Sequence, residues 1–147
     1  QLEDPSYKIR YDDSGKPFVN SDLNISISHS KSMAAIVFSE HNEVGIDIEH
    51  KQNKIIRIKN KFLNDSEKLE NEYQYNVDNL TMMWTAKESI YKALGIKGVS
   101  LSDNIIIKNI NKSKGHGYYI KGKEKYKFDL KFFSIEEYIL CYAQSNN

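Results

Sequence analysis

The segment Asp78–Gly95 constrains the fold most, because it is the longest stretch with the apolar spacing of an amphipathic helix. Its sequence is DNLTMMWTAKESIYKALG. Asp78 can cap this helix, and Gly95 can end it because glycine readily adopts the left-handed conformation found after a last helical turn. Four apolar residues fall near one face, which we expect to be buried: Leu80, Met83, Ile90 and Leu94.

Most of the remaining sequence alternates apolar and polar residues over short runs, as half-buried strands do. Before the helix, three runs joined by polar turns predict a β-meander: LNISISHS, MAAIVFSE and VGIDIE. Between them and the helix, IIRIKNKFL has helix-compatible spacing, and NDSEKLENEY predicts a short helix capped by Asp65 or Ser66. After the long helix, four runs predict further strands: NIIIKNI, GYYIKG, YKFDLKFF and YILCYA. This pattern predicts the α+β class.

The composition limits the partners that a chain of this kind can have. Its 147 residues carry a net charge of +1, without the basic excess typical of nucleic-acid-binding proteins. No apolar run is long enough to span a bilayer, and the N-terminal QLEDPSYKIR lacks a signal-peptide core. Cys141 is the only cysteine, which excludes an internal disulfide and fits a small buried residue better than a nucleophile. We expect a cytoplasmic protein with no nucleic-acid or membrane partner.

The strand VGIDIEH carries two carboxylates on one face. Asp47 and Glu49 alternate with apolar residues, so their side chains point to the same side, roughly 7 Å apart from the rise per residue. Gly45 precedes them on that face and would let a ligand or a helix approach closely. Like charges in this arrangement need a cation or a hydrogen-bond network beside them.

Trp84, Glu88 and Lys92 are spaced four residues apart, so the long helix places them along one stripe. Glu88 and Lys92 alone would read as a surface ion pair worth roughly 0.3–0.5 kcal/mol. Beside the strand, Glu88 becomes a third hard oxygen donor, which suits Mg²⁺. Lys92 could then meet phosphate charge. The residues thus suggest a Mg²⁺–phosphate site.

Four motifs, in this order, resemble those of the 4′-phosphopantetheinyl transferase superfamily. VGIDIE looks like its G-x-D-x-E motif, and WTAKESIYKALG looks like its W-x-x-K-E-x-x-x-K motif. Upstream, GKP and ISHS match two further signatures of the larger, surfactin-synthetase-activating type. Each motif is weak alone, but together they cover residues 15–98 in the family's order and spacing.

The resemblance implies an enzyme, a transferase that moves the phosphopantetheine arm of coenzyme A to a serine of an acyl or peptidyl carrier protein and releases 3′,5′-ADP. Such enzymes serve fatty acid, polyketide or nonribosomal peptide biosynthesis. The implied Mg²⁺ ligands are Asp47, Glu49 and Glu88. The residues implied to bind coenzyme A are Lys16, Pro17, Ser28, His29, Asp47 and Lys92, with Lys92 at the pyrophosphate, Ser28 and His29 at the phosphates of the adenosine side, and Lys16 and Pro17 near the adenine nucleotide. The implied catalytic residues are Asp47, Glu88 and Lys92, with Glu88 as candidate general base. Trp84 is expected to pack the helix against the sheet.

The larger type also implies a domain organisation. Its members have two similar lobes related by a pseudo-twofold axis, each a small, mostly antiparallel sheet packed on a long helix. Residues 1–43 would be a remnant of the first lobe, with the GKP and SHS motifs, and residues 44–147 a complete second lobe. Part of the first lobe would then lie upstream of Gln1, and a full-length chain would be a monomer. A naturally short protein is the other interpretation, because the smaller, trimeric holo-acyl-carrier-protein-synthase type has about this length; that type, however, lacks GKP and ISHS.

Two alternatives to a transferase remain. One is a non-catalytic module of this family that binds coenzyme A or a nucleotide, and the other is an α+β interaction domain whose motif matches are coincidental. The basic, apolar segment KIIRIKNKFL could dock on an acidic carrier protein through Lys59 and Lys61, or could be a solvated helix face.

Overall fold

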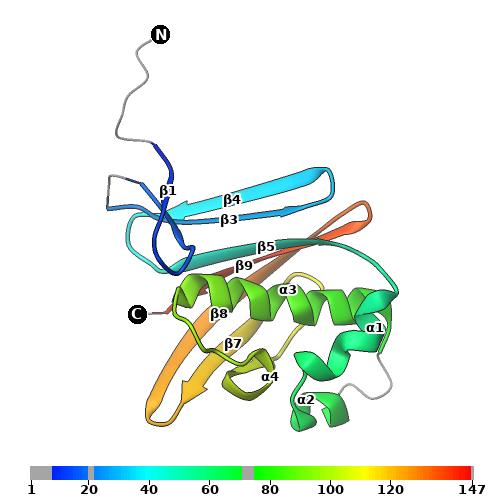
Figure 1. Cartoon of the computed structure of the whole chain (residues 1–147). Coiled ribbons are helices and arrows are strands. Elements are labelled where there is room, and N and C mark those ends of the chain that lie inside the picture. The colour runs from blue at the N-terminus through cyan, green and yellow to red at the C-terminus, as the bar shows by residue number, and fades with distance from the viewer. Residues whose placement is uncertain (1–7, 20–21, 71–74, 147) are drawn as a thin grey trace.

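The protein, seen here as a computed structural model, folds into two antiparallel sheets and a few helices, which confirms the α+β class (Figure 1). The structure describes residues 8–19, 22–70 and 75–146. Part of the expected first-lobe remnant, residues 1–7 and 20–21, and the end of the NDSEKLENEY segment, residues 71–74, lie outside the described residues.

The first sheet has four strands in the order β1-β2-β3-β4. Strands β1 (Arg10–Tyr11) and β2 (Pro17–Phe18) are short, whereas β3 (Asn24–Ser30) and β4 (Met33–Ser39) form a hairpin across seven residue pairs. The alternation in NISISHS predicted β3, and the run MAAIVFS was also predicted to be a strand; both predictions are confirmed. The described residues before Val44 contain no helix.

The second sheet has five antiparallel strands in the order β5-β9-β8-β7-β6. Strand β5 lies at one edge and carries both carboxylates of VGIDIEH. The strands are β5 (Val44–His50), β6 (Ile105–Lys108), β7 (Lys114–Lys121), β8 (Glu124–Ile135) and β9 (Tyr138–Ser145). All four strands expected after the long helix are therefore present.

The expected β-meander is wrong at its third strand, because β5 forms its backbone ladder with β9 and not with β4. The other edge of β5 lies against β3, where serine hydroxyls replace the backbone acceptors of a ladder. Along this contact, which we call the serine ladder, the backbone N–H groups of Ile46, Ile48 and His50 donate to the hydroxyl oxygens of Ser26, Ser28 and Ser30 at 3.0, 3.3 and 3.2 Å. The alternation that identified β3 as a strand also aligns these serines along β5.

Helix α3 (Val77–Leu94) lies across one face of the second sheet (Figure 1). Its cap is Asn76, whose side chain accepts from the N–H of Asn79, so the expected cap Asp78 is wrong and lies in the first turn. Gly95 ends the helix with φ 61°, as expected. Of the predicted apolar face, Leu80, Met83 and Ile90 are buried and Leu94 is half-buried.

The shorter helices lie beside α3. They are α1 (Lys54–Ile58), the 3₁₀ turn η2 (Lys59–Lys61), α2 (Asp65–Glu70) and α4 (Leu101–Asn104). Helix α2 is capped by Asn64, one residue before the expected caps: Asn64 Oδ1 accepts from the Glu67 N–H at 2.8 Å, and Glu67 Oε2 accepts from the Asn64 N–H at 3.0 Å. This reciprocal pair is a capping box.

A fully buried ion pair fixes α3 against α2 and β6. Lys87 Nζ lies 2.6 Å from Glu67 Oε2 and also donates to the carbonyl oxygens of Leu101 and Ile105 at 3.0 and 2.7 Å. Glu67 Oε1 in turn accepts from the N–H of Ile107 at 2.8 Å. Three acceptors satisfy the ammonium, as burial of a charge requires. Lys87, although it belongs to the W-x-x-K-E motif, is therefore part of the core.

Candidate active site

Strand β5 is buried on both faces at its centre, because α3 covers the side that carries the carboxylates. Helix and strand meet most closely at Gly45. A Cβ atom on Gly45 would overlap the carbonyl oxygen of Ser89 and lie 2.6 Å from the N atom of Ala93. Glycine at this position thus admits the helix, one of the two approaches expected from the sequence, and sets Asp47 and Glu49 opposite the stripe Trp84, Glu88 and Lys92.

Asp47 is the most deeply buried carboxylate of this group, with 4% of its surface exposed. Its Oδ1 atom accepts from Lys92 Nζ at 2.8 Å and from Ser28 Oγ at 2.9 Å. Its Oδ2 atom is buried and has no hydrogen-bond partner among the described residues. Burial raises the pKa of Asp47 to about 6, against the opposing effect of Lys92. One carboxylate oxygen of Asp47 is therefore free of donors from the residues that the structure describes.

The partner of Lys92 shows whether the helical stripe is an exposed ion pair or part of the site. Its ammonium forms an ion pair with Asp47 on β5, in which Lys92 is half-buried and Asp47 is buried. A surface pair between Glu88 and Lys92 is therefore the wrong interpretation. The helix and the strand are joined by an ion pair across the interface instead.

Glu88 has a strongly perturbed environment. Burial is the main cause that raises its pKa to about 7, and the negative charges of Asp47 and Glu49 add to the effect. Lys92 opposes it only in part. The three carboxylates are thus close enough to interact electrostatically, and one of them titrates near neutral pH.

Glu49 is held by two donors. Its Oε1 accepts from Trp84 Nε1 and its Oε2 from Ser30 Oγ, both at 3.3 Å. The Trp84 ring also packs edge-on against Phe62, with centroids 5.3 Å apart. Trp84 was expected to pack α3 against the sheet; its ring contact is with Phe62, and it is joined to the sheet by the hydrogen bond that orients Glu49 of β5.

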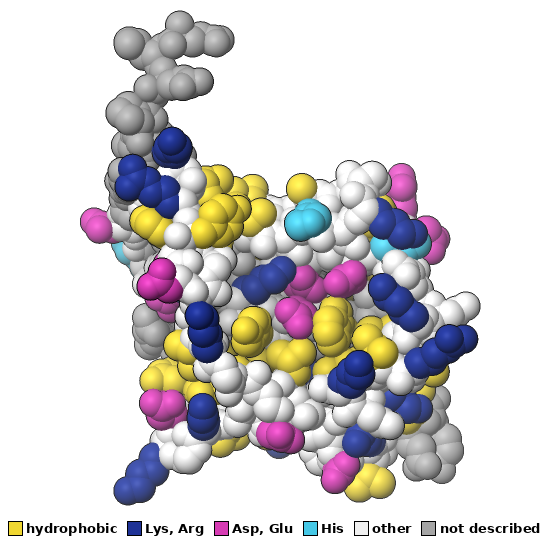
Figure 2. All heavy atoms as spheres, viewed as in Figure 1, with side chains coloured by type: hydrophobic (Ala, Val, Ile, Leu, Met, Phe, Trp, Pro, Cys, Tyr) yellow, Lys and Arg dark blue, Asp and Glu magenta, His cyan; other side chains and the backbone are white. Residues whose placement is uncertain are grey.

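In the described part of the chain, no group of three or more His, Cys, Asp or Glu side chains is arranged so that it could hold a metal ion as it stands. The chemistry of the carboxylate group nevertheless fits a hard cation. Asp47 Oδ2 is a buried oxygen with no partner in that part of the chain, and burial together with the negative charges of Asp47 and Glu49 raises the pKa of Glu88. Figure 2 shows acidic side chains gathered near the middle of this face of the molecule, beside a basic side chain.

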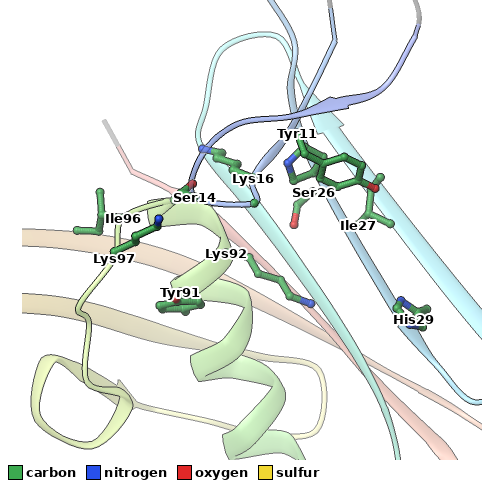
Figure 3. A pocket seen from close by; sticks show the side chains of 13 residues that line it. Tyr11, Ser14, Lys16, Ser26, Ile27, His29, Tyr91, Lys92, Ile96 and Lys97 are labelled. Atoms are coloured by element: carbon green, nitrogen blue, oxygen red, sulfur yellow. The ribbon is translucent and has the colours of Figure 1, made fainter.

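A cavity of about 270 Å³ opens next to this group (Figure 3). One wall is the turn 12–17 with strand β3, and the other is the C-terminal end of α3 with the residues that follow it. Of the residues expected to bind coenzyme A, Lys16, Pro17, His29 and Lys92 line it.

Ser28 does not line this cavity. It is 5% exposed, donates to Asp47 and accepts from the N–H of Ile48. The cavity also has walls that the motifs did not indicate: Tyr11, Tyr91, Ile96 and Lys97. Tyr91 and Lys97 could have been suspected, because they flank Lys92 and the helix end; Tyr11 carries no local signal.

A smaller cavity of about 110 Å³ lies on the α1 side of Glu49. Glu49 and Trp84 border it together with Ile55 and Ile58 of α1. The carboxylate group is therefore flanked by a cavity on each side. No helix among the described residues has the length and apolar character needed to cross a membrane.

Comparison with known proteins identifies the family of this chain. The family model of the 4′-phosphopantetheinyl transferase superfamily matches residues 43–143, and the chain belongs to this superfamily. The chain is 38% identical over 99 residues to the 4′-phosphopantetheinyl transferase gsp of Aneurinibacillus migulanus, a match that covers 65% of this chain and 41% of that relative. The chain thus spans less than half of the length of this relative.

The fold is similar to that of a solved holo-ACP-synthase from Plasmodium yoelii. The two structures superpose with a TM-score of 0.54 at 25% sequence identity. The similarity covers 71% of this chain and 95% of the Plasmodium chain.

Proposed function

We propose that this chain transfers the 4′-phosphopantetheine arm of coenzyme A to a serine hydroxyl of an acyl or peptidyl carrier protein. The observation that carries the proposal is the position of Lys92. It lines the larger cavity, and its ammonium is bonded to the buried Asp47 of the carboxylate group. A nucleotide in that cavity would place its pyrophosphate beside Lys92 and beside the carboxylates that would hold a metal ion, and phosphoryl transfer depends on positioning and charge stabilisation of this kind.

Asp47, Glu49 and Glu88 would hold Mg²⁺ in this proposal. When bound, the ion would neutralise pyrophosphate charge and stabilise the departing nucleotide. Hard carboxylate oxygens suit it, and Asp47 Oδ2, which has no hydrogen-bond partner among the described residues, is an available metal ligand. His29, which lines the cavity, would meet the phosphates of the adenosine side.

Glu88 is suited to be the general base. Its pKa of about 7 lies close to physiological pH, where a base is both available and strong enough. The serine oxygen would form a bond to the phosphorus that carries the pantetheine arm, and the bond from this phosphorus to the bridging oxygen would break. The serine proton passes to Glu88, directly or through water, and 3′,5′-ADP leaves with charge that Lys92 compensates.

The carrier protein would approach from the side of α1. The smaller cavity opens there beside Glu49, and Ile56 and Arg57 are exposed on the same helix. Lys61 is also exposed, whereas the Lys59 ammonium lies 4.2 Å from the Tyr75 ring. Lys61 is thus the better candidate for an acidic carrier. The proposal retains a cytoplasmic location and a role in fatty acid, polyketide or nonribosomal peptide biosynthesis.

The test is to incubate apo-carrier protein with the chain, coenzyme A and Mg²⁺, and to record the intact mass of the carrier. We expect a gain of one phosphopantetheine group that EDTA abolishes and that Glu88→Gln slows by orders of magnitude. Calorimetry with coenzyme A runs in parallel. Binding without transfer would identify the chain as a coenzyme A-binding module, and neither binding nor transfer would refute the proposal.

A further inference from the structure

The ammonium of Lys16 is engaged by protein groups at the rim of the larger cavity. Lys16 Nζ lies 2.6 Å from Glu43 Oε2 and donates to the carbonyl oxygen of Ala93 at 3.2 Å. Glu43 directly precedes β5, and Ala93 belongs to the last turn of α3. The Lys16 side chain thus connects the turn 12–17 with the start of β5 and with the end of α3.

The turn that carries Lys16 is itself well ordered by hydrogen bonds. Asp12 Oδ1 accepts from the N–H of Ser14 at 2.8 Å, from its hydroxyl at 2.6 Å, and from the N–H of Lys16 at 2.9 Å. Two backbone bonds close the same turn, from Gly15 N to Asp12 O and from Asp12 N to Lys16 O. An aspartate that binds its own turn in this way fixes the backbone, so the Lys16 side chain leaves it in a set direction.

The C-terminal end of α3 leaves room for the Lys16 side chain. Gly95, which ends α3 with φ 61°, lies directly under the Lys16 stem: a Cβ atom at Gly95 would lie 2.6 Å from Lys16 Cδ. A cation is also favourable at the C-terminal end of a helix, where the last carbonyl groups lack partners. Figure 3 shows Lys16 over this end of α3, while Lys92 extends toward the side where His29 lies.

The turn and the end of α3 are the two facing walls of the cavity. A contact between them controls how far apart they lie, and a nucleotide has to fit between them. The Lys16 ammonium already donates to a carboxylate and to a helix carbonyl oxygen, which leaves one N–H for a phosphate, whereas the only acceptor of Lys92 among the described residues is Asp47. Lys92 and Lys97 are other cations on the lining.

We propose that Lys16 is a positioning residue that sets the separation of the two cavity walls through Glu43 and Ala93, and that it does not contact the nucleotide phosphates. The inference rests on the proposed function, because it assigns the cavity to coenzyme A. In this proposal the lysine of the GKP motif does not recognise the charge of the ligand. Glu43, which belongs to none of the motifs, contributes to the affinity for coenzyme A.

The test compares coenzyme A with dephospho-coenzyme A, which lacks the 3′-phosphate, by calorimetry on Lys16→Met and Glu43→Gln. We expect each variant to weaken both ligands by the same factor, roughly twofold to tenfold for a partly exposed ion pair. The double variant should be no weaker than Lys16→Met alone, because both changes break one link. Lys112→Met, at an exposed lysine in the turn between β6 and β7, is the control for loss of charge.

A phosphate-binding Lys16 gives the opposite pattern. Lys16→Met would then cost coenzyme A more affinity than its dephospho form, and Glu43→Gln would strengthen binding by releasing the ammonium; either result overturns the inference. Amide hydrogen exchange supplies a readout without ligand. Exchange at the N–H groups of Lys16 and Gly95 should become faster in both variants. Unchanged exchange overturns the inference, even if the wild-type protein binds neither ligand. Failure of the wild-type protein to bind either ligand would count separately against the proposed function.

Discussion

Replacing Glu88 by Gln should stabilise the metal-free protein at alkaline pH, although it removes the proposed base. Burial, together with Asp47 and Glu49, raises the pKa of Glu88 from 4.5 to about 7. The folded state therefore binds this proton more tightly than the unfolded state does, so the stability falls as pH rises from about 4.5 to about 7 and levels off above that. A rise of this size corresponds to about 3 kcal/mol at pH 8, which is an upper value because the carboxylates titrate together.

Urea unfolding in EDTA at pH 5, 6, 7 and 8 measures the effect. Glu88→Gln should match wild type near pH 5 and exceed it by about 1–3 kcal/mol at pH 8, or roughly 2–4 °C in Tm for each kcal/mol. Added Mg²⁺ should reduce the difference in unfolding free energy between Glu88→Gln and wild type, because the ion would neutralise the carboxylate charge in wild type. Glu137→Gln, at an exposed carboxylate, is the control and should show no pH-dependent gain. A Glu88→Gln protein no more stable than wild type at pH 8 would refute the reasoning.

Three further predictions concern the lysines. Lys92→Ala should weaken coenzyme A binding about tenfold or more and slow single-turnover transfer, with Lys92→Arg rescuing only part, as calorimetry and rapid quench can show; wild-type behaviour would remove Lys92 from the site. Lys87→Met should cost about 3–5 kcal/mol in urea unfolding because it removes the lysine that pairs with the buried Glu67 carboxylate. Adding Glu67→Gln should recover part of that loss, and no recovery would contradict the ion-pair explanation. Lys61→Glu should raise KM for the carrier, more at low salt, without changing KM for coenzyme A; a carrier KM that is constant across salt would exclude docking there.

The sequence was most informative where structure follows from local periodicity. Helix α3 and the long strands could be predicted because each has one buried face and a regular apolar spacing. The pairing of β5 with β9 could not, because strand partners far apart in sequence leave no local mark. The caps were misplaced by one or two residues at Asn64 and Asn76, since several neighbouring residues can bind the same N–H groups.

The candidate site shows the same division. Alternation placed Asp47 and Glu49 on one strand face, and helical spacing placed Glu88 and Lys92 on one stripe; the structure brings the two elements together. The burial of Lys87 could not be anticipated, because its acceptors come from α2, α4 and β6. Nor could the attachment of Lys16 to Glu43 and Ala93, which depends on how the turn 12–17 meets the end of α3.

The serine ladder between β3 and β5 leads to a last prediction, about Ser28. A serine hydroxyl has one proton, and Ser28 donates it to Asp47 Oδ1. In this arrangement it can offer a phosphate oxygen no hydrogen bond, and its effect on the site runs through Asp47. Ser28→Ala should therefore remove one donor from Asp47, raise the pKa of this carboxyl further, and increase the Mg²⁺ concentration needed for half-maximal transfer.

Ser26→Ala is the matched control. Ser26 is buried in the same ladder and accepts from the N–H of Ile46, but no carboxylate lies among its hydrogen-bond partners in the described part of the chain. Each substitution leaves one buried N–H without its acceptor, so both should cost about 1–3 kcal/mol in urea unfolding. Only Ser28→Ala should shift the Mg²⁺ requirement, measured at saturating coenzyme A. If the two variants shift it equally, the ladder acts by holding β3 against β5 and not by orienting Asp47; if Ser28→Ala instead weakens coenzyme A alone, Ser28 contacts the ligand.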